Sequence, residues 1–291
     1  MATLQALTKE FLEHLEIEKN RASATRDSYA FYLNRFLTFS RLTKPQQITA
    51  EAVRRYRLYL NRLTTSSKEP LKKNTQYYHL IALRAFLKYL SKRDIATLAA
   101  EKIELGKMPD RQVEVLGSND LKTLLDAQLQ KLETKKISLL QLRDKAILEL
   151  FFSTGLRVSE LCSLQRDAIN TTQEEFTVRG KGSKLRVVFL SPEARHWIGE
   201  YRKLRGDASP YLFIRYDRAA KTASEEQPLT PRSVQRLVAH YAKVAGITKQ
   251  VHPHMLRHQF ATDLLNNGAN IRAVQEMFFF IFISTTDIYT H

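Results

Sequence analysis

Large apolar residues recur every three or four positions along much of the chain, which is the spacing of one face of an α-helix. In the first hundred residues this spacing predicts four helices. Polar residues that can cap a helix and a helix-breaking proline, Pro45, separate them. The expected helices cover residues 4–17 and 23–42, a segment that follows Thr49 and includes Leu60, and a segment that opens at Asn74 or Thr75 and includes Leu90.

The pattern weakens between Asp94 and Leu116 and then resumes. Two short β-branched runs, joined by a glycine-containing turn, predict an antiparallel hairpin. The other segments read as helices: one capped by Ser118, Leu139 to Ser153 closed by Gly155, VSELCSL, 230–245, 254–265 and 270–277. We therefore expect a mainly α protein with a four-helix domain at residues 1–105, a linker at 106–113 and a mostly helical domain with a small antiparallel β-sheet at 114–291.

Charge is the strongest global property of the chain. Lys and Arg number 46 against 30 Asp and Glu, for a net charge of +16. Such an excess attracts polyanions, and release of counterions from phosphates is its usual use, although a merely solubilising surface is the alternative. The dominance of one sign beside tyrosines favours DNA contact, and the candidate residues are Arg54, Arg55, Lys72, Lys73, Arg84, Lys184, Arg186 and Arg232.

Other classes of protein are disfavoured. The first sixteen residues are acidic and amphipathic, without the apolar core of a signal peptide, and the longest apolar tract is far shorter than the roughly 20 residues of a membrane span. One cysteine, Cys162, permits neither an internal disulfide framework nor a cysteine-rich zinc site. We expect a cytoplasmic, nucleoid-associated protein without a membrane contact.

Three short segments of the second domain carry candidate chemistry. In STGLRVSEL, residues 153–161, Glu160 lies three positions after Arg157 and can brace its guanidinium. In GKGSKLR, residues 180–186, Lys181 lies at a hairpin tip and can reach into a partner's groove. A surface ion pair and a solubilising turn are the plainer interpretations of these two segments.

The third segment, HPHMLRHQFAT, spans residues 252–262. His254 and Arg257 are three apart and share a helix face, which suits phosphate binding with proton transfer. His252, His254 and His258 also permit a metal interpretation, but a neighbouring arginine repels a cation and no nearby carboxylate or cysteine completes a ligand set. We expect no metal.

These segments, in this order and followed by a terminal IYTH, resemble the tyrosine recombinases of the Xer and phage-integrase group. The resemblance covers nearly the whole chain. It implies an N-terminal DNA-binding domain, a catalytic domain, and a homo-tetramer, or a hetero-tetramer with a related recombinase, that acts on two sites in double-stranded DNA.

The resemblance also implies residue roles and a reaction. Tyr289 would be the nucleophile that forms a 3′-phosphotyrosyl link, and Arg157 and Arg257 would bind the scissile phosphate. Lys181 would protonate the leaving 5′ oxygen, His254 would assist proton transfer and Glu160 would support the site. Because the covalent link conserves the bond energy, no ATP, metal or other cofactor is expected.

One stretch departs from the family. The family has Leu-Gly-His-x-x-Ile, or tryptophan for the histidine, before the tyrosine segment, and here those positions are Phe278 to Ile283. Phe280 stands at the His/Trp position and Phe279 at the glycine. Two interpretations of the tract compete: a buried hydrophobic plug, or an engineered or aberrant substitution. Because of Phe279 and Phe280, a DNA-binding protein of recombinase fold with impaired catalysis stays open as an alternative. A type IB topoisomerase, which shares the phosphotyrosine chemistry, is a further alternative.

Overall fold

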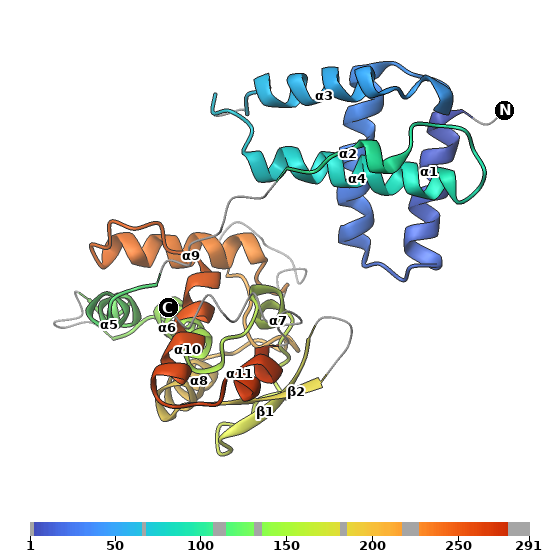
Figure 1. The fold of residues 1–291 in the computed structure, drawn as a ribbon. Coiled ribbons are helices and arrows are strands. Elements are labelled where there is room, and N and C mark those ends of the chain that lie inside the picture. Colours follow the sequence, from blue (N-terminus) through green and yellow to red (C-terminus); the bar gives the residue numbers. More distant parts are fainter. Residues whose placement is uncertain are drawn as a thin grey trace. The chain divides into compact units, whose positions relative to one another are not determined.

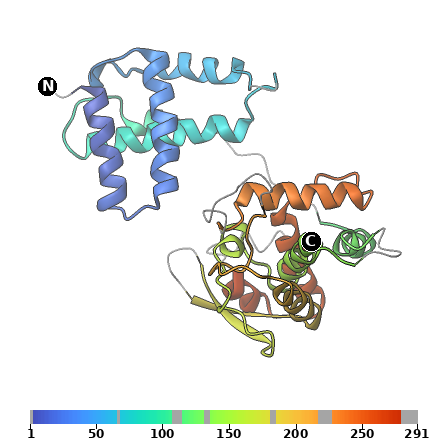
Figure 2. The same cartoon turned by 180° about the vertical axis from the view of Figure 1, so that it is seen from behind.

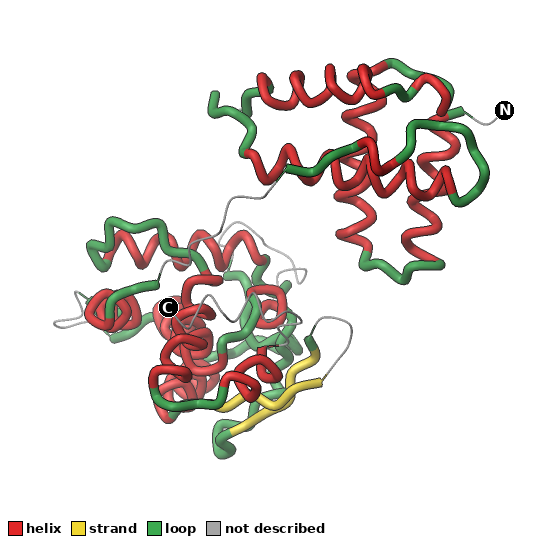
Figure 3. Tube along the Cα trace, viewed as in Figure 1, coloured by secondary structure: helices red, strands yellow, loops and turns green. Residues whose placement is uncertain are grey.

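The structure, a computed structural model, describes residues 3–65, 68–106, 115–130, 136–180, 185–216 and 227–278. The chain divides into two compact units, residues 1–111 and 112–291, here called the N-terminal and C-terminal units. The division falls inside the expected linker, residues 106–113, of which the structure describes only Gly106. Helices dominate both units (Figures 1 and 3), so the expected fold class, mainly α with one small sheet, is confirmed.

The N-terminal unit consists of four helices around one apolar core. They are α1 (Leu4–Ile17), α2 (Ser23–Ser40), α3 (Ala50–Arg62) and α4 (Lys73–Ser91), with short 3-10 turns η1 (Pro45–Gln47) and η2 (Ala100–Lys102). The Thr49 hydroxyl accepts a hydrogen bond from the Ala52 N–H, as expected of a cap residue. The core contains Phe11, Phe36, Tyr56 and Phe86, each at most 2% exposed. The four predicted helices are present, with ends shifted by at most two residues.

The C-terminal unit is built around α6. Its elements are α5 (Ser118–Asp126), α6 (Leu139–Thr154), α7 (Val158–Cys162), β1 (Glu175–Arg179), β2 (Leu185–Phe189), α8 (Pro192–Lys203), α9 (Pro231–Val244), α10 (Pro253–Asn266) and α11 (Ile271–Phe278). Helix α6 is buried around most of its circumference, because α8, α10 and α5 all pack against it (Figure 2). None of the helices in the described ranges combines the length and apolarity needed to cross a bilayer.

Helix α8 was not predicted by the hydrophobic pattern. Its start carries the same signal as α9, because Ser191 caps it and Pro192 follows, just as Thr230 and Pro231 do for α9. The buried face comprises Ala194, Ile198 and Tyr201. Ser191 followed by Pro192 is therefore the sequence signal that marks the start of α8.

The hairpin aligns Phe176 with Val188 and Val178 with Arg186. Inner and outer positions alternate along both strands, and the inner positions of β2 are Arg186 and Val188. Leu185, Val187 and Phe189 are exposed instead. The strand therefore directs an arginine into the protein interior and three apolar side chains outward.

Candidate active site

The turn after α6 positions the first predicted arginine. Gly155 ends α6 with φ of 55° and ψ of 31°, a left-handed conformation that glycine adopts without a steric penalty. Two residues later Arg157 caps α7, and the Glu160 carboxylate reaches back to accept a bond of 2.8 Å from the Arg157 backbone N–H. The conformation of this turn, which we call the 155–160 turn, therefore fixes where both side chains start.

The Glu160 carboxylate lies between two guanidinium groups. Arg157 Nη1 donates to Oε1 at 2.8 Å. Arg186 forms a two-pronged pair, with Nη1 at 3.0 Å from Oε1 and Nη2 at 2.7 Å from Oε2. Glu160 and Arg186 are both at most 7% exposed, whereas the Arg157 side chain retains 25% of its exposure. Arg186 therefore belongs to the support of the site, and Arg157 is the arginine that solvent reaches.

These contacts determine the ionisation of Glu160. Burial by itself raises the pKa of this carboxyl group, but hydrogen bonds from Arg186 and from the Arg157 backbone outweigh burial and hold the pKa at about 2, below the ordinary 4.5. Glu160 is consequently charged throughout the neutral range, and it offsets part of the repulsion between the guanidinium groups beside it.

The same turn also holds the second predicted arginine. Arg257 lies in α10, is 4% exposed, and donates from Nη1 to the carbonyl oxygen of Gly155. Helix α10 packs against α6, which brings residues about a hundred positions apart onto one turn. Arg157 and Arg257, predicted from separate segments, are thus both bonded to residues of the 155–160 turn.

His254 differs from Arg257 in its environment. It is exposed at the start of α10, while Arg257 is buried one turn later. The neighbouring His252 caps the helix, its Nδ1 accepting from the Met255 N–H at 3.2 Å, and the His252 and His254 rings lie 6.4 Å apart. Within the described ranges no three His, Cys, Asp or Glu side chains gather as a metal site requires.

Comparison with known proteins identifies the family. The profile of the phage integrase family matches residues 114–291, and that of the phage integrase N-terminal SAM-like domain matches residues 7–97. Tyrosine recombinase XerC of Thermodesulfovibrio yellowstonii is 32% identical over 100% of this chain and 93% of its own length. Tyrosine recombinase XerD of Chlorobaculum tepidum is 33% identical over 97% of this chain and 90% of its own length.

The chain belongs to the tyrosine recombinases of the phage integrase family. It is therefore a site-specific DNA recombinase, an enzyme that cleaves and rejoins DNA through a 3′-phosphotyrosyl intermediate without metal or ATP.

Solved structures agree with this membership. The crystal structure of XerA recombinase is 28% identical and matches with a TM-score of 0.51, covering 99% of this chain and 93% of that one. The fold is also that of XerH site-specific recombinase bound to difH substrate, with a TM-score of 0.72 at 20% identity over 98% of this chain and 81% of that one.

Several expected site residues of this recombinase lie outside the described residues. They are Lys181 and Lys184 of the hairpin turn, and Phe279, Phe280 and Tyr289 near the end of the sequence. The described part ends with α11, whose start is capped as predicted, because Asn270 Oδ1 accepts from the Arg272 N–H at 2.8 Å.

The expected DNA contacts fall into distinct environments. Arg54, Arg55, Lys72, Lys73 and Arg232 are exposed, Arg84 is half-buried and Arg186 is buried. Glu51 pairs with Arg54 at 2.7 Å and with Arg55 at 3.7 Å. Lys73 donates to Asn61 at 2.9 Å. Burial of Arg186 and the pairing of Arg54 and Arg55 with Glu51 therefore leave fewer cations for DNA than the sequence suggests.

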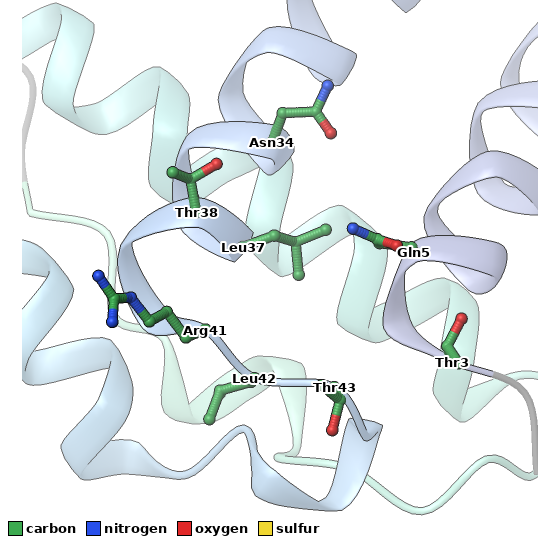
Figure 4. Close-up of a pocket in the computed structure, with 8 residues that line it drawn as sticks. All are labelled: Thr3, Gln5, Asn34, Leu37, Thr38, Arg41, Leu42 and Thr43. Atoms are coloured by element: carbon green, nitrogen blue, oxygen red, sulfur yellow. The ribbon is translucent and has the colours of Figure 1, made fainter.

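A pocket of about 340 Å³ lies within the N-terminal unit, between the start of α1 and the end of α2 (Figure 4). It is lined by Thr3, Gln5, Asn34, Leu37, Thr38, Arg41, Leu42 and Thr43. None of these is an expected site residue, and the pocket is separate from the arginine site of the C-terminal unit.

Replacing Glu160 with glutamine should destabilise the C-terminal unit by about 3 kcal/mol at neutral pH, because a lowered folded-state pKa contributes stability above the ordinary value. That contribution is complete above pH 4.5 and disappears as the pH falls towards about 2, so the two proteins should converge over this window. Denaturant unfolding followed by fluorescence of Trp197, the single tryptophan, measures this in the right unit, because Trp197 packs against its core.

Glu200→Gln is the matched control, because its pair with Lys203 is on the surface and such pairs contribute little. Equal unfolding free energies for Glu160→Gln and the unchanged protein at neutral pH would contradict the stabilising role of the carboxylate.

Proposed function

We propose that Arg157 and Arg257 bind the scissile phosphate of a DNA strand while Tyr289 attacks it. The observation that carries this proposal is that two arginines from distant segments are bonded to residues of one turn. Negative charge grows on the phosphoryl oxygens during attack, and cations that are already fixed stabilise it without reorganisation. Glu160 holds the first arginine and Arg186 holds Glu160, so we assign Arg186 to the support of the site and not to DNA contact.

In each strand cleavage the phosphoryl group passes from the 5′ oxygen to Tyr289. The Tyr289 oxygen forms a bond to phosphorus, the bond from phosphorus to the 5′ oxygen breaks, and Lys181 gives that oxygen its proton. The phenol has an ordinary pKa of about 10, so it needs help to lose its own proton, and His254, exposed at the start of α10, is the group we assign to it. A 5′ hydroxyl from another strand then reverses the steps and releases Tyr289.

The partner we propose is double-stranded DNA. A tetramer would bring two recombination sites together, and it would consist of four copies of this chain or of this chain with a related recombinase. Supporting this, XerH is described bound to difH substrate. The four-helix domain, residues 1–105, would contact the site through exposed cations such as Lys72 and Lys73. Action on double-stranded DNA accords with a cytoplasmic, nucleoid-associated location, which we include in the proposal.

The tract from Phe278 to Ile283 favours a second candidate, a recombinase that binds its site but cleaves it poorly. Phenylalanine at position 280 has no N–H to donate to the phosphate. Loss of one transition-state donor elsewhere costs roughly 2.7–4 kcal/mol, or about a hundred- to a thousand-fold in rate. Phenylalanine at position 279 also incurs a penalty if the chain must turn there in a left-handed conformation.

The first test is capture of the covalent intermediate. The full chain selects its site from a library of randomised duplexes, and the selected duplex is then nicked so that the cleaved end diffuses away. We expect a protein–DNA adduct that is absent from Tyr289→Phe and retained by the control Tyr211→Phe, detected by a denaturing gel. Site binding without any adduct would support the poorly cleaving candidate. Exchange between two sites, as opposed to relaxation of supercoils alone, excludes a type IB topoisomerase.

The second test restores the residues that the family has in the tract. Phe279→Gly combined with Phe280→His should raise the rate of adduct formation by about a hundred-fold, because a donor and a turn are regained. Phe282→His is the control, since it adds a histidine at a position where the family has no phosphate ligand. No gain from the double change would show that the tract does not limit cleavage.

A further inference from the structure

Arg35, on α2 of the N-terminal unit, is held in place by a buried histidine. His79 of α4 is 0% exposed, and its Nδ1 lies 2.8 Å from the carbonyl oxygen of Thr75. A carbonyl only accepts, so Nδ1 carries the proton and Nε2 presents its lone pair. Arg35 Nη1 lies 3.3 Å from Nε2 and donates to it. Burial and the charge of Arg35 lower the pKa of His79, which keeps the ring neutral and able to accept.

A second contact fixes the plane of the same guanidinium. Its central carbon lies 4.6 Å from the centre of the Phe31 ring, one turn earlier on α2. Arg35 Nη1 is thus bonded to His79, and the Phe31 ring covers one face of the guanidinium. Arg35 has five N–H donors, and the bond to His79 uses one of them. Its remaining donors are presented in a defined orientation.

Arg35 is also not neutralised. It forms no ion pair with any carboxylate in the described part of the chain, whereas Arg26, Arg54 and Arg93 each do. Arg93 makes the closest comparison, because it too lies over an aromatic ring, Tyr89 at 4.3 Å, yet its charge is shared with Glu10 and Glu18. Arg35 has the rigidity of a structural arginine without its counter-charge.

Exposed aromatic side chains also lie on α2 and α4, two helices that pack against each other (Figures 1 and 2). Phe31 is 53% exposed and Tyr78 is 46% exposed. Tyr32 stacks on Tyr78 at 6.4 Å and lies 4.5 Å from the His79 ring, so one cluster joins the two helices. The Phe31 ring covers one face of the guanidinium, and the exposed aromatic rings beside it can pack against a planar partner that carries acceptor atoms.

We propose that Arg35 reads a base edge in the DNA site, with two acceptors as on guanine, and that His79 is the positioning residue that aims it. This inference rests on the proposed function, because it takes duplex DNA as the ligand. Charge alone attracts a phosphate, and many exposed lysines of this chain supply it. A guanidinium fixed in plane and direction adds selectivity where two acceptors must be met together, as on the edge of guanine.

Site selection by the full chain from randomised duplexes tests the inference. Arg35→Lys keeps the charge and loses the fork, so preference for one base pair should fall by about tenfold or more while the other positions keep theirs. His79→Leu, which removes the acceptor, should relax the same position alone. His79→Gln, which returns an acceptor near Nε2, should recover it. Arg93→Lys, the matched control, should select the original site.

Each result decides the matter. A uniform loss of affinity in Arg35→Lys, or an unchanged site, overturns the inference, since the first indicates a phosphate contact and the second no contact. Relaxation of every position by His79→Leu reduces His79 to a folding role. If the unchanged protein forms its Tyr289 adduct on the selected site while Arg35→Lys selects an identical one, this inference fails and the proposed function stands. If the unchanged protein selects no sequence, both fail.

Discussion

The arginine site of the C-terminal unit depends on the ion pairs that the Glu160 carboxylate makes with Arg157 and Arg186. Guanidinium groups that lie close together repel each other. A buried carboxylate that accepts from Arg157 and Arg186 relieves that repulsion beforehand. Burying the charges of Glu160 and Arg186 is unfavourable on its own, and removal of either partner would leave the other uncompensated. The site therefore exists as a set, held by bonds that do not involve DNA.

The cations of the whole chain also differ in whether a carboxylate neutralises them. A net charge of +16 suggests a uniform attraction for polyanions, but the individual cations differ. Some are paired on the surface, as Arg54 is with Glu51, and some are buried against a carboxylate, as Arg186 is. Others, such as Lys72, are exposed. Long-range attraction comes from the sum, whereas recognition comes from the few cations whose geometry is fixed in advance.

Much of this organisation was predictable, because it rests on local signals. Thr49, Gly155 and Thr230 act within a few residues of their own position, and their types identify helix ends correctly. The 3.6-residue period predicted the four-helix unit for the same reason. Helix α8 was missed although Ser191 and Pro192 mark it.

The role of Arg186 was not predictable from its own strand. In β2 the sequence LRVVF has apolar residues at the exposed positions and arginine at a buried one, the reverse of the usual alternation. Only the partner, Glu160, explains this inversion, and it lies twenty-six residues earlier on a different element. The packing of Arg257 on Gly155 spans a still longer interval. Contacts of this kind depend on the completed fold.

The arginine framework and the tract before Tyr289 are separable parts of the site. Every bond described for Arg157, Glu160, Arg186 and Arg257 joins residues between positions 155 and 257, well before Phe278 in the sequence. None of these bonds involves a residue of the tract. Under the proposed function, the cost of the tract falls on the transition state, where a missing donor matters most. A recombinase altered in this way would still hold its DNA while losing rate.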